Sequence, residues 1–98
     1  MIVKVHKSDG KIILAVCDKE LLGKKFNEKN KQLDLTSSFY QGEEKSNDEL
    51  RSLIKKSYII NLVGKKSVDF GVKEDIISKA HIIKIKNVPH AQAIIIRE

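Results

Sequence analysis

The residues of this chain best suited to recognition chemistry stand at positions 87–92, Asn-Val-Pro-His-Ala-Gln. This polar stretch holds the only proline and separates two isoleucine-rich runs, residues 81–86 and 93–97. Both runs are typical of β-strands, so we expect residues 87–92 to form the tip that joins them. A neutral imidazole at His90, beside the amide of Gln92, could contact a base edge or a backbone amide of a partner. The alternative is a structural histidine whose ring bonds a nearby carbonyl group and holds the turn.

Nucleophilic catalysis would depend on Cys17, the single cysteine. Cys17 follows an apolar run and precedes a short helical turn, a position where the helix dipole lowers the pKa of a thiol. A reactive thiol also needs a base, and sequence spacing brings none of the candidates His6, His81 and His90 near it. A buried, inert cysteine is the simpler interpretation. We therefore assign no catalytic residue, and an enzyme that uses His90 with Cys17 or Asn61 is kept as an alternative.

Metal and cofactor chemistry has little support in the sequence. Three histidines and one cysteine without paired spacing do not make a zinc motif, so we expect neither a metal nor a cofactor. Residues 64–67, Gly-Lys-Lys-Ser, are similar to the end of a phosphate-binding loop, but Ile59 stands where the first glycine of that motif belongs. A lone cysteine, the absence of a leader-like segment and the absence of an 18-residue apolar run predict a cytoplasmic protein that does not engage a membrane.

The composition indicates one small, basic domain over residues 1–98. Hydrophobic residues make up 41% and charged residues 33%, and the formal net charge is +6. A basic chain favours an anionic partner such as RNA or a ribonucleoprotein, although scattered lysines also serve solubility alone. The bias toward Lys, Glu and Ile is typical of proteins from hot environments and equally of genomes rich in A and T.

Two further groups could contact a partner. Phe39 and Tyr40 are adjacent in a loop, so one ring could be exposed for stacking on RNA or for docking a protein partner. The alternative places one ring in the core and the other over a helix cap. Lys84 and Lys86 alternate with isoleucines, which predicts one shared strand face, and together with residues 65–66 they could contact phosphates.

These residues must be positioned by a short series of elements. Asp-Gly at residues 9–10 predicts a hairpin between two apolar runs, and Ser46 with Glu49 predicts a capping box that begins a helix. We expect strands at residues 2–6, 11–17, 32–36, 81–86 and 93–97, a loop at 24–31, and helices at 46–58 and 59–73. We also expect Asp18 to cap the short turn that follows it. The order β-β-β-α-α-β-β predicts an α+β domain, with a mixed or antiparallel sheet and two helices on one face.

Four segments of the chain, taken in order, resemble the archaeal "domain of unknown function 424" family. They are residues 16–24 (Val-Cys-Asp-Lys-Glu-Leu-Leu-Gly-Lys), 38–43 (Ser-Phe-Tyr-Gln-Gly-Glu), 61–64 (Asn-Leu-Val-Gly) and 88–92 (Val-Pro-His-Ala-Gln). The resemblance covers the whole chain and implies an association with RNA or translation rather than an activity. The chain departs from the family pattern at Gln41, where a small residue is expected, and it has no glycine after Glu74.

The sequence thus predicts a non-catalytic module that binds RNA or a ribonucleoprotein of the translation apparatus. Lysines would supply sequence-independent affinity, and Tyr40, His90 and Gln92 would supply local recognition. A protein–protein adaptor that docks through Phe39 and Tyr40 is the alternative from another class. The predicted binding residues are Phe39, Tyr40, Gly42, Asn61, Gly64, Lys65, Lys66, Lys84, Lys86, Pro89, His90 and Gln92.

Overall fold

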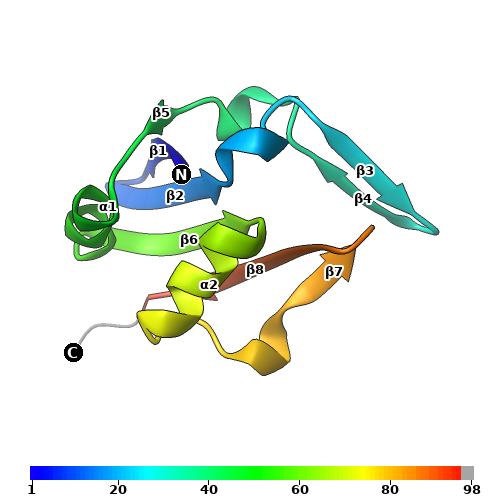
Figure 1. The fold of residues 1–98 in the computed structure, drawn as a ribbon. Helices are drawn as coiled ribbons and strands as arrows, with labels where there is room; N and C mark the ends of the chain where they lie inside the picture. The colour runs from blue at the N-terminus through cyan, green and yellow to red at the C-terminus, as the bar shows by residue number, and fades with distance from the viewer. Residues whose placement is uncertain (96–98) are drawn as a thin grey trace.

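One mixed β-sheet organises the fold, and two α-helices cover one of its faces (Figure 1). A computed structural model describes residues 1–95. The elements follow in the order β1 (Ile2–Ser8), β2 (Lys11–Cys17), the 3-10 turn η1 (Lys19–Leu21), β3 (Lys25–Glu28), β4 (Lys31–Asp34), η2 (Ser38–Tyr40), β5 (Glu43–Glu44), α1 (Asn47–Ile54), β6 (Ser57–Val63), α2 (Lys65–Lys73), η3 (Lys79–His81), β7 (Ile83–Ile85) and β8 (Val88–Ile94). The predicted α+β class, with a mixed sheet and two helices on one face, is confirmed.

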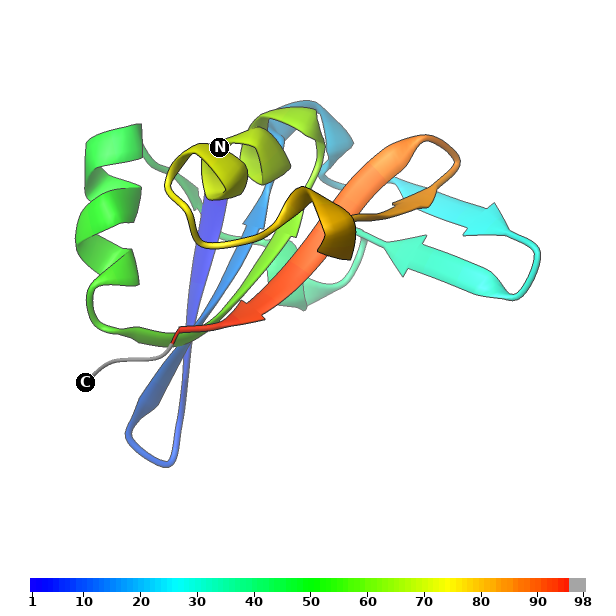
Figure 2. The ribbon, with the colours of Figure 1, turned by 90° about the horizontal axis from the view of Figure 1, so that it is seen from below.

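The six-stranded sheet has the order β5-β1-β2-β6-β8-β7. Strands β2 and β6 run parallel, and every other neighbouring pair is antiparallel. Strands β3 and β4 form a separate two-stranded hairpin that projects beside the sheet (Figure 2). The predicted first hairpin is confirmed, because Asp9 and Gly10 join β1 to β2 with φ values of 51° and 76°. Positive φ at both central residues matches the right-handed twist of the flanking strands.

The prediction of a helix over residues 59–73 is wrong in its first part. Residues 57–63 form β6, which lies between β2 and β8 in the middle of the sheet. Helix α1 ends at Ile54, and the hydroxyl group of Ser57 donates a hydrogen bond of 2.7 Å to the carbonyl of Leu53. A run that is apolar on both faces suits a central strand, and strand neighbours on both sides satisfy its backbone groups.

The prediction of a loop at residues 24–31 is also wrong. These residues contribute β3 and the start of β4, joined through Lys29 at a φ of 54°. Phe26 and Leu33 face each other across the hairpin and pack against the sheet, whereas most of the other side chains are exposed. Two apolar residues in a lysine-rich segment give a weak strand pattern, so their contact with the sheet decides the conformation.

The predicted tip at residues 87–92 is a strand instead. The turn consists of Lys86 and Asn87, whose φ values of 51° and 65° are those of a two-residue hairpin turn, and β8 begins directly after it. Pro89 has no N–H group to donate, but it faces Lys84 on the short strand β7, and its carbonyl accepts a bond of 2.8 Å from the Gly64 amide. The strand predicted at residues 93–97 extends past the described part of the chain.

Side chains of the sheet alternate between two apolar clusters. The helix face of the sheet packs Leu14, Ile60 and Leu62 against Leu50 of α1 and Phe70 of α2. The opposite face, here called the hairpin face, packs Cys17, Val63 and Val88 against Leu33 and Leu35 from the β3–β4 segment. Each strand therefore sends alternate residues to different partners, so adjacent residues of β8 lie in different environments.

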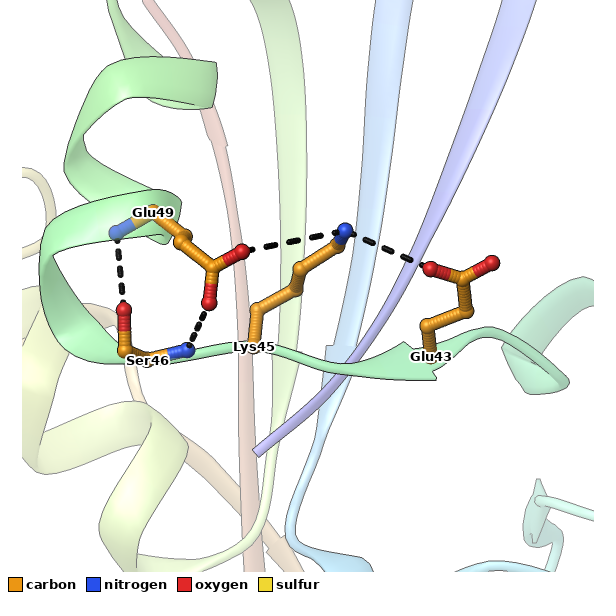
Figure 3. A network of polar contacts seen from close by, with 4 residues as sticks. All are labelled: Glu43, Lys45, Ser46 and Glu49. Atoms are coloured by element: carbon orange, nitrogen blue, oxygen red, sulfur yellow. Dashed lines mark hydrogen bonds and ion pairs between the residues drawn. The ribbon is translucent and has the colours of Figure 1, made fainter.

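Helix α1 begins with the predicted capping box. The Glu49 amide donates to the Ser46 hydroxyl oxygen at 3.1 Å, and the Ser46 amide donates to the Glu49 carboxylate at 3.0 Å (Figure 3). Lys45 lies between the carboxylates of Glu43 and Glu49, at 3.3 Å and 4.0 Å. Two reciprocal bonds and a bridging cation thus hold the entry into α1 to strand β5.

Candidate functional site

The structure divides the predicted binding residues between the two faces of the sheet. Asn61 on β6 and Gln92 on β8 are paired across the two strands. His90 lies two residues before Gln92 on β8, opposite Val63, and therefore on the same hairpin face. Tyr40 packs into the apolar cluster of this hairpin face. Lysines 65 and 84 and Pro89 instead line a groove on the helix side. The groove lysines therefore lie on a different face of the sheet from Tyr40, His90 and Gln92, because neighbouring residues of β8 alternate between the two faces.

His90 lies half-buried on the hairpin face. Its Nε2 atom is buried and has no hydrogen-bond partner among residues 1–95. Burial lowers the pKa of His90 below its ordinary value, and the nearby positive charge of Lys31 lowers it further. The bond to a carbonyl considered for His90 is not made by its Nε2 atom, whereas the Nε2 atom of His6 donates to the Phe39 carbonyl at 2.9 Å.

The aromatic loop is engaged within the molecule. The Phe39 ring stacks on His6 with centroids 4.5 Å apart and 12° between the planes, and Tyr40 meets Phe39 edge-on at 5.1 Å. Burial raises the pKa of Tyr40, and the proximity of Cys17 adds to the rise. Gly42 lies close against β1, and a Cβ atom at this position would collide with the Val3 carbonyl. The Tyr-Gln-Gly segment therefore docks this loop onto the sheet.

Cys17 is unsuited to nucleophilic chemistry. It is fully buried at the end of β2. Burial raises the pKa of its thiol to about 11, and the adjacent Asp18 carboxylate contributes to the rise. The buried, inert cysteine favoured from the sequence is confirmed, since the thiol is packed in the hairpin-face cluster and not at an accessible helix end. A protonated, inaccessible thiol lacks the thiolate that attacks a substrate.

Asp18 has a role that sequence reasoning missed. It was expected to cap η1, but its side chain makes no cap bond there. Its carboxylate instead accepts hydrogen bonds from the Lys66 amide at 3.0 Å, the Ser67 amide at 2.8 Å and the Ser67 hydroxyl at 2.7 Å. Gly64 has a φ of 106°, and a Cβ atom there would collide with this carboxyl group. Asp18 thus caps α2 from a distant part of the chain and occupies the amides that a phosphate would use.

A groove runs between α2 and the β7–β8 end of the sheet. Its volume is about 630 Å³. Val68, Val72, Ile82 and Pro89 provide its apolar lining. The polar lining consists of Lys65, Asp69, Lys79, Lys84 and Asn87. Residues 65, 68, 69 and 72 have the i, i+3, i+4, i+7 spacing of one helix face, a signal from which this half of the groove could have been predicted.

The lysines around this groove are free to meet an anion. Lys65, Lys79 and Lys84 are exposed and form no ion pair within residues 1–95, whereas Asp69 is paired with Lys73 at 3.0 Å. A second hollow of about 230 Å³ shares Lys65, Asn87 and Pro89 with the groove and adds Lys66. The structure therefore brings together lysines from α2, η3 and β7 that lie up to 19 residues apart in sequence.

Lys86 and the hairpin extend this lysine-rich end of the molecule. Lys86 lies in the β7–β8 turn and not in a strand with Lys84, so the predicted shared strand face is wrong. The amide of Lys86 donates to the Glu28 carboxylate of β3 at 3.4 Å. This bond connects the turn to the β3–β4 hairpin, which carries exposed Lys25, Lys29 and Lys31.

No group of three His, Cys, Asp or Glu side chains within residues 1–95 is arranged to hold a metal ion. None of the helices described is long and apolar enough to cross a membrane.

Fold and site together define a small α+β protein with a lysine-rimmed groove beside its second helix. A family model described as "Protein of unknown function (DUF424)" matches residues 6–96, and the chain belongs to this family. No curated protein matches the sequence. The chain is similar to a solved structure, the crystal structure of an uncharacterized conserved protein from Methanopyrus kandleri. The two are 25% identical with a TM-score of 0.80, over 99% of this chain and 93% of the other.

Proposed function

We propose that this protein is a non-catalytic, cytoplasmic module that binds RNA or a ribonucleoprotein, and that it works with the translation apparatus. One observation carries the proposal. Exposed lysines from three elements surround one groove, and none of them is neutralised by an ion pair within residues 1–95. Like charges held close together without partners are unfavourable for the free protein, and a polyanion relieves that repulsion.

The proposal assigns phosphate contacts to Lys65, Lys66, Lys79 and Lys84. Each contact with single-stranded RNA releases condensed counterions and contributes about −0.7 to the slope of log affinity against log salt concentration. Four contacts therefore predict a slope of about −3, which corresponds to a loss of roughly 50-fold in affinity between 50 and 200 mM salt. The side chains are lysines rather than arginines, so each would contact a phosphate as a point charge and not through a two-pronged fork.

The chain offers a matched control for this proposal. Lys55 and Lys56 precede β6, and Lys65 and Lys66 follow it, so the two exposed pairs stand at opposite ends of one seven-residue strand. At about 3.3 Å per residue, this strand separates the pairs by roughly 20 Å. Both pairs have the same charge, but only the second pair lies at the groove and the neighbouring hollow.

The test measures the fluorescence anisotropy of a labelled single-stranded RNA across a salt series. Lys65→Ala/Lys66→Ala should reduce the salt slope by about 1.4, and Lys55→Ala/Lys56→Ala should leave it unchanged. Circular dichroism confirms that both variants are folded. Equal losses in the two variants would show that net charge alone drives binding, and binding without salt dependence would refute the proposal.

A further inference from the structure

We infer that the groove between α2 and β7 holds a single unpaired nucleotide of the RNA, with its base on the apolar lining and its flanking phosphates on the lysines. This inference rests on the proposed function and adds to it a preference for single strands. A purely electrostatic surface does not distinguish a strand with bases from a strand without them, whereas a groove that takes up a base does.

The size and lining of the groove fit such an occupant. Its volume of about 630 Å³ lies within the range of small-molecule sites, which is roughly 300 to 1,000 Å³. Val68 and Val72 lie one turn apart on α2, and Ile82 and Pro89 complete the apolar lining from the β7–β8 side. A base buries two apolar faces when it leaves water, so an aliphatic wall on each side stabilises it there. Bases within a duplex are already stacked and cannot enter.

The charges of the groove are placed at its edge, as a nucleotide requires. Lys65 stands on the first turn of α2, Lys79 on η3 and Lys84 on β7, so the cations surround the apolar lining from three elements. Because the Asp18 carboxylate already occupies the first-turn amides of α2, a phosphate must bind to the lysine ammonium groups and not to the helix end.

Asn87 provides a group that can contact the base edge. It lines both the groove and the neighbouring hollow, and its backbone is held at a φ of 65° in the two-residue turn. Its side-chain amide offers both donors and an acceptor, which are the groups that read the edge of an unpaired base. A carboxylate-rich peptide would satisfy the lysines but would leave the apolar lining without a partner.

The decisive comparison uses the wild-type protein and two RNA strands of equal length and charge, one with bases and one abasic throughout. Uptake of one base should make the normal strand bind at least about fivefold more tightly at 150 mM salt, the low end of the range for base stacking. Annealing the normal strand to its complement should lower its affinity. Val72→Gln, on the groove lining, should reduce the difference between normal and abasic strands and leave the salt slope unchanged.

Each outcome separates the inference from the proposed function. Equal affinity for the two strands, with the salt slope retained, overturns the inference and leaves phosphate binding intact. Absence of binding to either strand at 50 mM salt overturns both. Binding of a glutamate-rich peptide in preference to both strands also overturns both, in favour of an acidic protein partner. Because the central comparison uses the unmodified protein, it stands even if Val72→Gln fails to fold.

Discussion

The contact between Asp18 and α2 predicts a large loss of stability when the Asp18 carboxylate is removed. Asp18 is 3% exposed and accepts three hydrogen bonds from the first turn of α2, two of them from backbone amides. In Asp18→Ala, the loss of a helix cap costs about 1 to 2 kcal/mol of unfolding free energy. The hydroxyl of Ser67, which is fully buried, also loses its acceptor, at a cost of about 1 to 2 kcal/mol. We therefore expect a total loss of about 3 kcal/mol.

The assay is equilibrium unfolding in urea, followed by circular dichroism. With a slope of about 1.5 kcal/mol per molar urea, the midpoint should fall by about 2 M. Asp18→Asn retains one acceptor oxygen but presents an amide donor to the Lys66 N–H group, so about half of the loss is expected. Asp69→Ala is the control on the same helix, because it breaks only the exposed ion pair with Lys73 and should change stability by less than about 0.5 kcal/mol.

A double-mutant cycle tests the assigned contact itself. Ser67→Ala removes the hydroxyl that bonds Asp18 at 2.7 Å, so the double variant should lose about 1 kcal/mol less than the sum of the two single variants. Additive losses would refute a direct contact between these side chains. A midpoint shift below about 0.3 M in Asp18→Ala would refute the capping role.

Two further predictions concern His90 and Gly42. Because the pKa of His90 is lower in the folded protein than its unfolded value near 6.5, the unfolded chain binds more protons between these two values. The free energy of unfolding should therefore be fully retained above about pH 6.5 and should decrease below that pH, by at most about 1.4 kcal/mol per pH unit. Urea titrations at pH 5 to 8 measure this dependence, and His90→Leu should reduce it. The control His81→Gln, at an exposed histidine, should preserve it. Gly42→Ala places a methyl group against the Val3 carbonyl, so it should lower the thermal midpoint by an amount equivalent to about 2 to 3 kcal/mol, and a change below about 0.5 kcal/mol would show that the backbone accommodates it.

Local interactions in this protein could be predicted from sequence because their partners are neighbours in the chain. Asp9 and Gly10 supply the positive φ values of the first hairpin, and Ser46 and Glu49 complete a capping box within one turn. The α+β class followed from the grouping of apolar runs, which does not require their register. Each of these features depends on fewer than five consecutive residues or on coarse periodicity.

Segments whose conformation depends on distant neighbours were predicted less well. Residues 59–63 form an apolar run that suits a buried helix or a central strand, and hydrogen bonds to β2 and β8 decide for the strand. The polar residues 25–34 become a hairpin because Phe26 and Leu33 reach the sheet. Residues 88–92 belong to β8 and not to a tip, so Pro89 and His90 lie on opposite faces of the sheet.

The sequence by itself determined the family, the basic charge, the first hairpin and the cap of α1, since these depend on composition and on contacts between near neighbours. Only the tertiary structure decided that Asp18 caps a helix 48 residues away and that Lys65 and Lys84 face one groove. The reason is physical. Burial, shifted pKa values and clusters of charge arise from distances between side chains, and those distances are set by strand pairing and packing across the whole sheet.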